Sequence, residues 1–301
     1  MINLVEQIRF LAVSDLFSLK AFGGEWPSRS AFFVSKLGKS PKKKDFILLG
    51  DHLSSAFRLA GKGDRSQGSV SSAGSTWEAL LVWYLNICLV GTNSVCLRGS
   101  KFCPKSIQDA MSVCFENTIL KSEPDVVLIS SNALLEVPAQ KNKLIEKADE
   151  IISESFDQTG LVNFQCKTNW NDNAQVPMLW NMLYNQARKG AIIPNGFSIG
   201  RNGFNLKNLG AFGYSFVTVP TQKKGPLGYK TSGLDVLRVK TMSAGNYWGH
   251  PTRSGICFSI REFFNFFNRN STIFPNVSDV GKLISTNGKV KSDFNYFRLH
   301  S

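Results

Sequence analysis

The sequence predicts an α/β fold in which helices flank a central mixed β-sheet, with a β-rich, basic elaboration toward the C-terminal end. The continuous apolar run at residues 126–129 and the mainly apolar segment at residues 161–164 predict the sheet, because such segments are typical of strands buried on both faces. The segments around these runs have helical patterns. Beyond residue 190 the chain changes to short β-like runs between glycines.

The first residues predict an N-terminal helix and no export signal. Residues 1–17 have an amphipathic pattern, in which Glu6 and Arg9 interrupt the apolar run that a signal peptide needs. The longest apolar run, residues 79–91, is shorter than the roughly 20 residues of a membrane span and predicts a buried helix. The 6 cysteines form no C-x-x-C pair, so structural zinc is not expected. We expect a cytoplasmic protein with reduced thiols and no membrane segment.

The next helix is predicted to follow a loop. Residues 61–75, GKGDRSQGSVSSAGS, have the Gly/Ser-rich composition of a loop. Ser75 or Thr76 is the candidate N-cap of the helix, and Gly91 is its predicted end. This assignment places Glu78 in the first helical turn, where a glutamate ordinarily interacts with the helix dipole.

A second helix is predicted over residues 106–120, and Pro124 separates it from the first buried strand. That strand contains the apolar run 126–129. Residues 140–156 then have the pattern of a helix with one charged, exposed side.

The second buried strand is predicted to begin at Gly160 and to contain the sequence LVNFQCKT. A further helix is predicted within residues 171–190, with Pro177 in its first turn and Gly190 at its end. A last helix is predicted near residues 261–270. The β-like runs of the C-terminal part occupy residues 196–206, 210–220, 234–243 and 255–260.

The charge distribution indicates a polyanionic partner. The formal net charge is +13, and residues 171–301 contain 16 of the 35 basic residues but only 5 of the 22 acidic ones. The basic residues alternate with Asn, Gly, Ser and aromatic residues, a composition typical of nucleic-acid-binding surfaces. A basic surface that serves only solubility is the alternative, and we favour nucleic acid.

Polar residues at the ends of the two predicted strands could support metal-assisted hydrolysis of a phosphodiester. Gln165 and Lys167 are two residues apart and therefore project from the same face of a strand. Asp125 comes directly before the apolar run of the other strand, so pairing of the two strands would bring its carboxylate to Gln165 and Lys167. Glu78 could add a second carboxylate. Magnesium prefers such hard oxygen ligands, and the cation would lower the pKa of a bound water.

The order of these groups resembles the PD-(D/E)XK nuclease superfamily, to which many type II restriction endonucleases belong. A helix-borne glutamate (Glu78) comes first, a Pro-Asp pair (124 and 125) precedes an apolar strand, and a Gln-Cys-Lys stretch (165–167) ends a second apolar strand that a helix follows. The resemblance covers about residues 70–190, and its motif is short.

The resemblance implies a role for each matching residue. Asp125 would be a ligand of Mg²⁺, and the main-chain carbonyl of Cys166 would be a further ligand. Lys167 would orient the attacking water or stabilise the charge that develops in the transition state.

Gln165 departs from the family pattern, which usually has Asp or Glu at this position. An amide oxygen can bind Mg²⁺ but contributes no negative charge. Either Glu78 or Glu123 would then have to replace the missing charge.

The function implied by the resemblance is a magnesium-dependent, sequence-specific endonuclease of the type II restriction kind that hydrolyses double-stranded DNA. We expect a single domain over residues 1–301, with a catalytic core at 70–190 and a basic, β-rich, DNA-contacting part at 191–301. Cutting both strands requires two sites, so we expect a homodimer or a heterodimer with a related subunit. The candidate DNA-contacting side chains are Arg201, Asn202, Lys223, Lys224, Lys230, Asn246 and Arg253.

Two other functions are compatible with the sequence. The protein could be a DNA-binding module that keeps the fold without cleavage, and the neutral Gln165 is the feature that favours this alternative. It could also be a repair or recombination nuclease that recognises DNA structure rather than sequence.

The Gly-rich stretch at 225–233 does not have the spacing of a Walker motif, because Tyr229 separates its glycine from Lys230.

Overall fold

The computed structural model describes residues 3–59, 67–116, 118–120, 124–168, 175–191, 196–219, 237, 243–248, 256–280, 285–286, 289–290 and 292–299. The helices are α1 (Leu4–Leu16), α2 (Lys20–Gly24), α3 (Trp26–Leu37), α4 (Lys43–Leu48), η1 (Leu49–His52), α5 (Leu53–Arg58), α6 (Gln67–Cys88), α7 (Lys105–Met111), α8 (Asn132–Glu136), α9 (Leu144–Glu154), η2 (Phe156–Gln158), α10 (Gln175–Arg188), η4 (Leu206–Asn208), η6 (Ile260–Phe264), α12 (Asn265–Asn268) and η7 (Ser292–Phe297). The strands are β1 (Ser94–Arg98), β2 (Val113–Phe115), β3 (Thr118–Leu120), β4 (Val126–Ser130), β5 (Gly160–Lys167), β6 (Phe197–Ile199), β7 (Ala211–Thr218), β8 (Gly245–Trp248), β9 (Ser285–Thr286) and β10 (Lys289–Val290).

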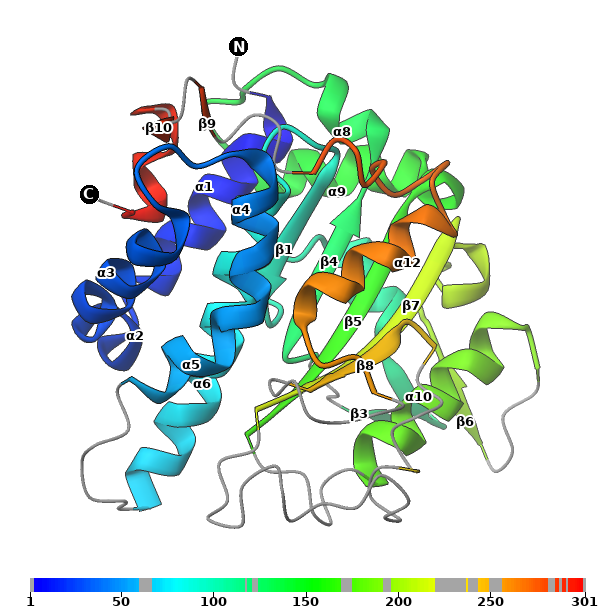
Figure 1. Ribbon diagram of the computed structural model, residues 1–301. Helices are drawn as coiled ribbons and strands as arrows, with labels where there is room; N and C mark the ends of the chain where they lie inside the picture. Colours follow the sequence, from blue (N-terminus) through cyan, green and yellow to red (C-terminus); the bar gives the residue numbers. More distant parts are fainter. Residues whose placement is uncertain are drawn as a thin grey trace.

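Five strands form the central sheet in the order β1-β4-β5-β7-β8 (Figure 1). β4 is antiparallel to both β1 and β5, whereas β7 is parallel to both β5 and β8. The prediction of a mixed sheet flanked by helices is therefore confirmed. β7 and β8 continue the sheet, so the part of the chain after residue 190 contributes two of its strands.

Each face of the sheet is covered by its own set of helices. Val126, Phe164 and Cys166 belong to a buried cluster with α6, α3 and α12. Val127 and Leu161 point the other way, into a cluster with α7, α9 and α10. This alternation follows from the period of two in a strand, and burial on both faces explains why residues 126–129 are all apolar and why only Asn163 is polar among residues 161–164. Figure 1 shows α12 in front of the sheet and α9 behind it.

The core on the α6 side is built around Trp83, whose side chain is fully buried. Its ring lies 4.8 Å from the Phe33 ring and 5.0 Å from the Trp26 ring, measured between centroids. The indole N–H of Trp83 donates a hydrogen bond of 3.1 Å to the carbonyl oxygen of Phe297. The N-terminal helices, α6 and the last described segment of the chain therefore share one aromatic core.

A buried arginine joins α1 to this arrangement. Arg9 has no exposed surface, and its guanidinium donates to Glu6 Oε2 at 3.0 Å, to Asn86 Oδ1 at 3.1 Å and to the Ser94 carbonyl at 2.8 Å. A buried charge is tolerated only when it is paired and hydrogen-bonded, as it is here. Arg9 consequently fixes α1 against α6 and against the edge strand β1.

The helix predicted for residues 106–120 is wrong beyond residue 111. Helix α7 ends at Met111, and Ser112 has the extended angles φ −62° and ψ 129°. Residues 113–115 and 118–120 form strands, and β2 pairs with β3 and β6 in a separate three-stranded sheet. Val113, Phe115 and Ile119 are β-branched or aromatic, and strand pairing exploits this preference.

The predicted start of the helix at residue 76 is also wrong. Helix α6 begins at Gln67, within the stretch predicted to be a Gly/Ser-rich loop. Propensity is a weak guide when tertiary packing holds the rest of the helix, and extending an existing helix is easier than nucleating one. Glu78 therefore lies about three turns inside α6 and not in its first turn.

Most other predicted elements are confirmed. They are the helices at residues 4–16, 144–154 and 175–188, the strands at 126–130 and 160–167, and the short helical segment at 260–268. Gly190 follows α10 with φ +72°, the left-handed conformation expected of a glycine that ends a helix. Residues 256–259 do not form the predicted strand, although Cys257 makes an isolated bridge to Tyr247.

Some sequence predictions lie outside the described residues. They concern Glu123, Lys223, Lys224, Lys230, Arg253 and most of the predicted strand at 234–243. Within the described part of the chain, no helix has the length and apolar character needed to cross a membrane.

Replacing Trp83 tests how much the aromatic core contributes to the stability of the fold. Trp83→Ala should lower the free energy of unfolding by about 4 kcal/mol, because it removes a buried ring and leaves a cavity. Trp83→Phe should lower it less, since a ring still fills most of the space. Urea denaturation followed by circular dichroism measures both values. Leu179→Ala, at a side chain that is 54% exposed, is the matched control. A loss below about 1 kcal/mol for Trp83→Ala would contradict this account.

Candidate active site

Antiparallel pairing brings the start of β4 and the end of β5 to the same end of the sheet. The last paired residues at this end are Val126 and Phe164. Asp125 directly precedes Val126, and Gln165 and Lys167 follow Phe164 along β5. The expected pairing of the two strands is therefore confirmed, and it brings together residues that are some 40 positions apart in the chain.

The carboxylate of Asp125 is the centre of this group. Its Oδ2 atom accepts hydrogen bonds from Gln165 Nε2 at 2.5 Å and from the main-chain N–H of Cys166 at 2.7 Å. The Lys167 ammonium lies 3.8 Å from the same oxygen, which is ion-pair distance but longer than a hydrogen bond. Asp125 thus faces two neutral donors and one positive charge.

The side chains at the end of β5 divide between the two faces of the sheet. Cys166 is buried in the cluster that contains α6, and burial raises the pKa of its thiol well above the ordinary value. Such a thiol is not a nucleophile at neutral pH. Gln165 and Lys167 point to the other face. Main-chain N–H and C=O groups of one strand residue point the same way, so the Cys166 carbonyl, like its N–H, is directed toward the Asp125 side.

Gln165 has a second partner on the neighbouring strand. The hydroxyl of Tyr214, on β7, donates to Gln165 Oε1 at 3.4 Å. Tyr214 is itself buried and packs at 5.9 Å from the ring of Tyr184 on α10. Burial raises the pKa of Tyr214 above its ordinary range, so the hydroxyl keeps its proton. Both ends of the Gln165 amide are consequently held in place.

Asp125 ionises less readily than an exposed aspartate. Burial raises the pKa of its carboxyl group, and three groups oppose this effect: the Lys167 charge, the Cys166 N–H and the Gln165 amide. The net direction is upward. The donors therefore offset only part of the cost of removing the carboxylate from water.

Glu78 reaches this end of the sheet from α6, on the face to which Cys166 points. Its carboxylate accepts a hydrogen bond from Arg98 Nη1 on β1 at 3.3 Å. Burial raises the pKa of Glu78 and the charge of Asp125 raises it further, while Arg98 and Lys167 offset part of the shift, so the pKa is about 7. Glu78 is therefore close enough for the charges of Asp125 and Lys167 to change its pKa.

Three oxygen donors at this site suit a hard divalent cation, provided that the Gln165 amide rotates. These donors are the Asp125 carboxylate, the Gln165 amide oxygen and the Cys166 carbonyl. In this structure Gln165 turns Nε2, and not Oε1, toward Asp125. Half a turn of the amide would present Oε1 and leave Nε2 to donate to the Tyr214 hydroxyl, which can accept as well as donate. The described residues contain no group of three or more His, Cys, Asp or Glu side chains that could hold a metal ion.

Two of the predicted DNA contacts are engaged in an ion-pair cluster. Asp109, which is 4% exposed, accepts from Arg201 Nε and Lys105 Nζ at 2.7 Å each, and from Asn202 Nδ2 at 2.9 Å. Burial alone would raise the pKa of Asp109, but these hydrogen bonds outweigh it and lower the pKa. Contact of Arg201 or Asn202 with DNA would therefore compete with Asp109.

A third predicted contact, Asn246, lies within the sheet. It pairs in register with Phe216 and is 5% exposed, so it is not presented to a DNA groove in this structure. The remaining candidates, Lys223, Lys224, Lys230 and Arg253, lie outside the described residues.

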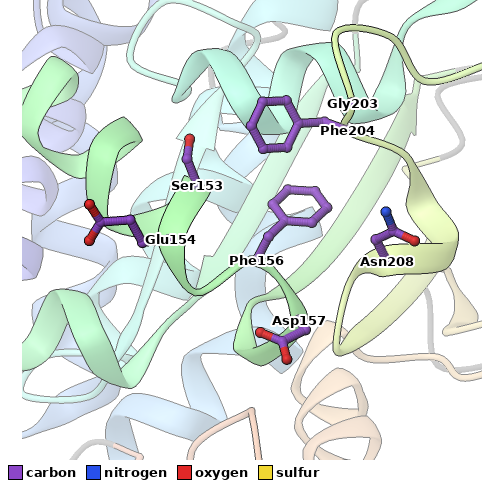
Figure 2. Close-up of a pocket in the computed structure, with 7 residues that line it drawn as sticks. All are labelled: Ser153, Glu154, Phe156, Asp157, Gly203, Phe204 and Asn208. Carbon is purple, nitrogen blue, oxygen red and sulfur yellow. The ribbon is translucent and has the colours of Figure 1, made fainter.

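A pocket of about 380 Å³ lies near the opposite end of β5. Figure 2 shows the Phe156 and Phe204 rings side by side, with Glu154 and Asp157 around them. The centroids of the two rings are 5.1 Å apart. Asp157 precedes the start of β5, whereas Lys167 ends it, so this pocket is separate from the Asp125 group.

Sequence reasoning missed Tyr214 and Arg98. The stretch GYSFVT places Tyr214, Phe216 and Thr218 on one face of a strand, but this alternation indicates only a strand and not that it lies beside Gln165. Arg98 carried no such signal, because its contact with Glu78 depends on how α6 packs on β1.

No protein-family model matches this chain, and no curated protein matches it.

Removing the carboxyl group of Glu78 should change how stability depends on pH. An unfolded glutamate ionises near pH 4.3, whereas Glu78 in the folded protein ionises near 7. Between these values the folded state binds more protons than the unfolded state, so the free energy of unfolding falls as pH rises. Relative to the wild type, Glu78→Gln should gain on the order of 2 to 3 kcal/mol between pH 4 and pH 8. Urea denaturation in EDTA at both pH values measures this gain.

The exposed Glu146→Gln is the control for this measurement and should show no comparable gain. Parallel pH curves for the wild type and Glu78→Gln would show that Glu78 is not buried beside Asp125.

Proposed function

We propose that this protein is a magnesium-dependent endonuclease of the type II restriction kind, with a core like that of the PD-(D/E)XK nucleases. One observation supports the proposal most strongly. Gln165 and Lys167, at the end of β5, approach the same carboxylate oxygen of Asp125, which directly precedes the paired strand β4. The order of these groups along the chain is the one on which the resemblance rests. The formal charge of +13 supports a polyanionic substrate.

Each residue has a role in phosphodiester hydrolysis. The attacking water forms a bond to phosphorus and loses a proton, while the bond to the leaving deoxyribose oxygen breaks. Asp125, the Gln165 amide oxygen and the Cys166 carbonyl would hold Mg²⁺, which acidifies a bound water and screens the phosphate. Lys167 would stabilise the negative charge that develops on phosphorus-bound oxygen. Glu78, which reaches this end of the sheet from the opposite face, would supply a second negative charge near the cation once it loses its proton.

The neutral Gln165 supports a second candidate, a DNA-binding module without cleavage. The Asp125 oxygen already faces two N–H donors and the Lys167 ammonium, and Glu78 is partly protonated at neutral pH. A cation must therefore displace these donors, and few negative charges are then available to bind it. We favour the nuclease, because the amide of Gln165 can rotate without losing its Tyr214 partner.

The proposal extends to DNA binding and assembly. The basic part at residues 191–301 would contact double-stranded DNA, and two copies, or one copy and a related subunit, would cut the two strands. A repair or recombination nuclease is the other enzyme compatible with this site. Discrete fragments from DNA of known sequence would identify the restriction type, whereas cleavage confined to branched or damaged DNA would identify the repair type.

Plasmid cleavage tests the enzyme directly. The purified protein should nick or linearise plasmid DNA in Mg²⁺ and not in EDTA. Asp125→Asn and Lys167→Ala should each reduce the rate at least 100-fold, because the first weakens the metal site and the second removes the positive charge. Gel shifts in EDTA should show that both variants still bind DNA.

Lys141→Ala, at an exposed lysine distant in sequence from the group, is the matched control and should cleave normally. Protein that shifts varied DNA but never cuts it would favour the non-cleaving module. Full cleavage activity in Lys167→Ala would contradict the assignment of this site.

Gln165→Glu tests whether the missing charge limits the site. A glutamate would add a second negative charge beside Asp125 and could still accept from the Tyr214 hydroxyl. We expect Mg²⁺ to bind roughly tenfold more tightly, and the metal-free variant to be less stable because two carboxylates repel each other. Calorimetric titration of Mg²⁺ and thermal denaturation in EDTA measure the two effects. Equal Mg²⁺ affinity in both proteins would show that residue 165 does not face the metal.

A further inference from the structure

Thr218, the last residue of β7, is the neighbour of Lys167 in the parallel pairing of β5 with β7. It is 1% exposed, and its hydroxyl oxygen makes no hydrogen bond in the described structure. Buried hydroxyl groups almost always have a partner, so an unpaired one requires an explanation.

The hydroxyl of Thr218 lies on the same face of the sheet as the Lys167 ammonium. Directly paired residues on neighbouring strands project to the same side. Val217 and Cys166 are both in the cluster that contains α6, so the residues that follow them, Thr218 and Lys167, project to the other face. Lys167 is thus flanked by Asp125 from β4 and by Thr218 from β7.

Valine has nearly the shape of threonine and would fill this position without an unpaired polar atom. Replacing a buried, unsatisfied hydroxyl by an apolar group of the same shape is neutral or stabilising. The hydroxyl therefore contributes nothing to the stability of the fold as it stands. A functional role, in which another state of the protein supplies the partner, is one explanation for an unsatisfied group of this kind.

Binding of a divalent cation would create such a state at Lys167. The ammonium lies 3.8 Å from Asp125 Oδ2, and it is not hydrogen-bonded to that oxygen. A cation on Asp125 would repel the ammonium and remove the attraction that holds it there. The ammonium then needs an acceptor nearby, and Thr218 has two unused lone pairs.

We propose that Thr218 is a positioning residue that accepts a hydrogen bond from Lys167 Nζ when Asp125 holds a divalent cation. This inference rests on the proposed metal site. The hydrogen bond fixes the ammonium beside the cation and directs its remaining N–H groups toward the phosphate. Thr218 acts only through Lys167 and does not touch the substrate.

Titration of the protein with Mg²⁺ alone, without DNA, tests the inference by calorimetry. Thr218→Val should weaken Mg²⁺ binding about five- to tenfold, because the displaced ammonium loses its acceptor. Thr218→Ser keeps the hydroxyl and should restore the affinity to near the wild-type value. In EDTA, Thr218→Val should unfold at the same temperature as the wild type or higher, which separates this effect from a folding defect.

A double-mutant cycle shows whether the effect passes through Lys167. In a Lys167→Ala background, Thr218→Val should cause no further loss of Mg²⁺ affinity. Thr118→Val, at an exposed threonine on β3, is the control and should bind Mg²⁺ normally.

The outcomes separate this inference from the proposed function. If the wild type binds Mg²⁺ and Thr218→Val binds it equally well, or if the loss persists without Lys167, the role of Thr218 is overturned and the nuclease stands. If the wild type and the Asp125→Asn variant both fail to bind Mg²⁺, the proposed metal site falls and the inference falls with it.

Discussion

The antiparallel pairing of β4 with β5 is the constraint on which the candidate site depends. The register runs from Ser130 opposite Gly160 to Val126 opposite Phe164. A slip of one residue would turn the apolar side chains of a strand to the wrong faces of the sheet. Because both faces are packed against helices, such a slip is excluded by the whole core. The geometry around Asp125 is therefore fixed by apolar packing and not by the polar contacts themselves.

The electrostatics of the site result from opposing effects, of which burial is the largest. Burial disfavours the charged forms of Asp125 and Glu78, while Lys167, Arg98 and main-chain N–H groups favour them. The site consequently carries little net negative charge at neutral pH. Such a site can sit against a polyanion without strong repulsion, which agrees with a basic protein. The small net charge also makes the affinity of the site for a cation sensitive to neighbouring dipoles.

The sequence predicted the part of the fold that depends on local pattern. The runs around 126–129 and 161–164 identified two central strands, and period-two alternation placed Gln165 and Lys167 on one face. Two features depended on contacts between distant segments and could not be read locally. The small sheet at residue 113 forms by pairing with residues 197–199, and Tyr214 reaches Gln165 only because β7 lies beside β5.

The aromatic core described above also has a consequence for synthesis of the chain. The indole of Trp83 pairs with the carbonyl of a residue 214 positions later, and Trp26 with one 272 positions later. A ribosome adds about 5 to 20 residues per second, so the partner of Trp83 emerges on the order of 10 to 40 seconds after Trp83 itself. During that interval the rings of α3 and α6 are made but not enclosed. The nascent chain therefore presents an aromatic surface to chaperones until residues near 297 arrive.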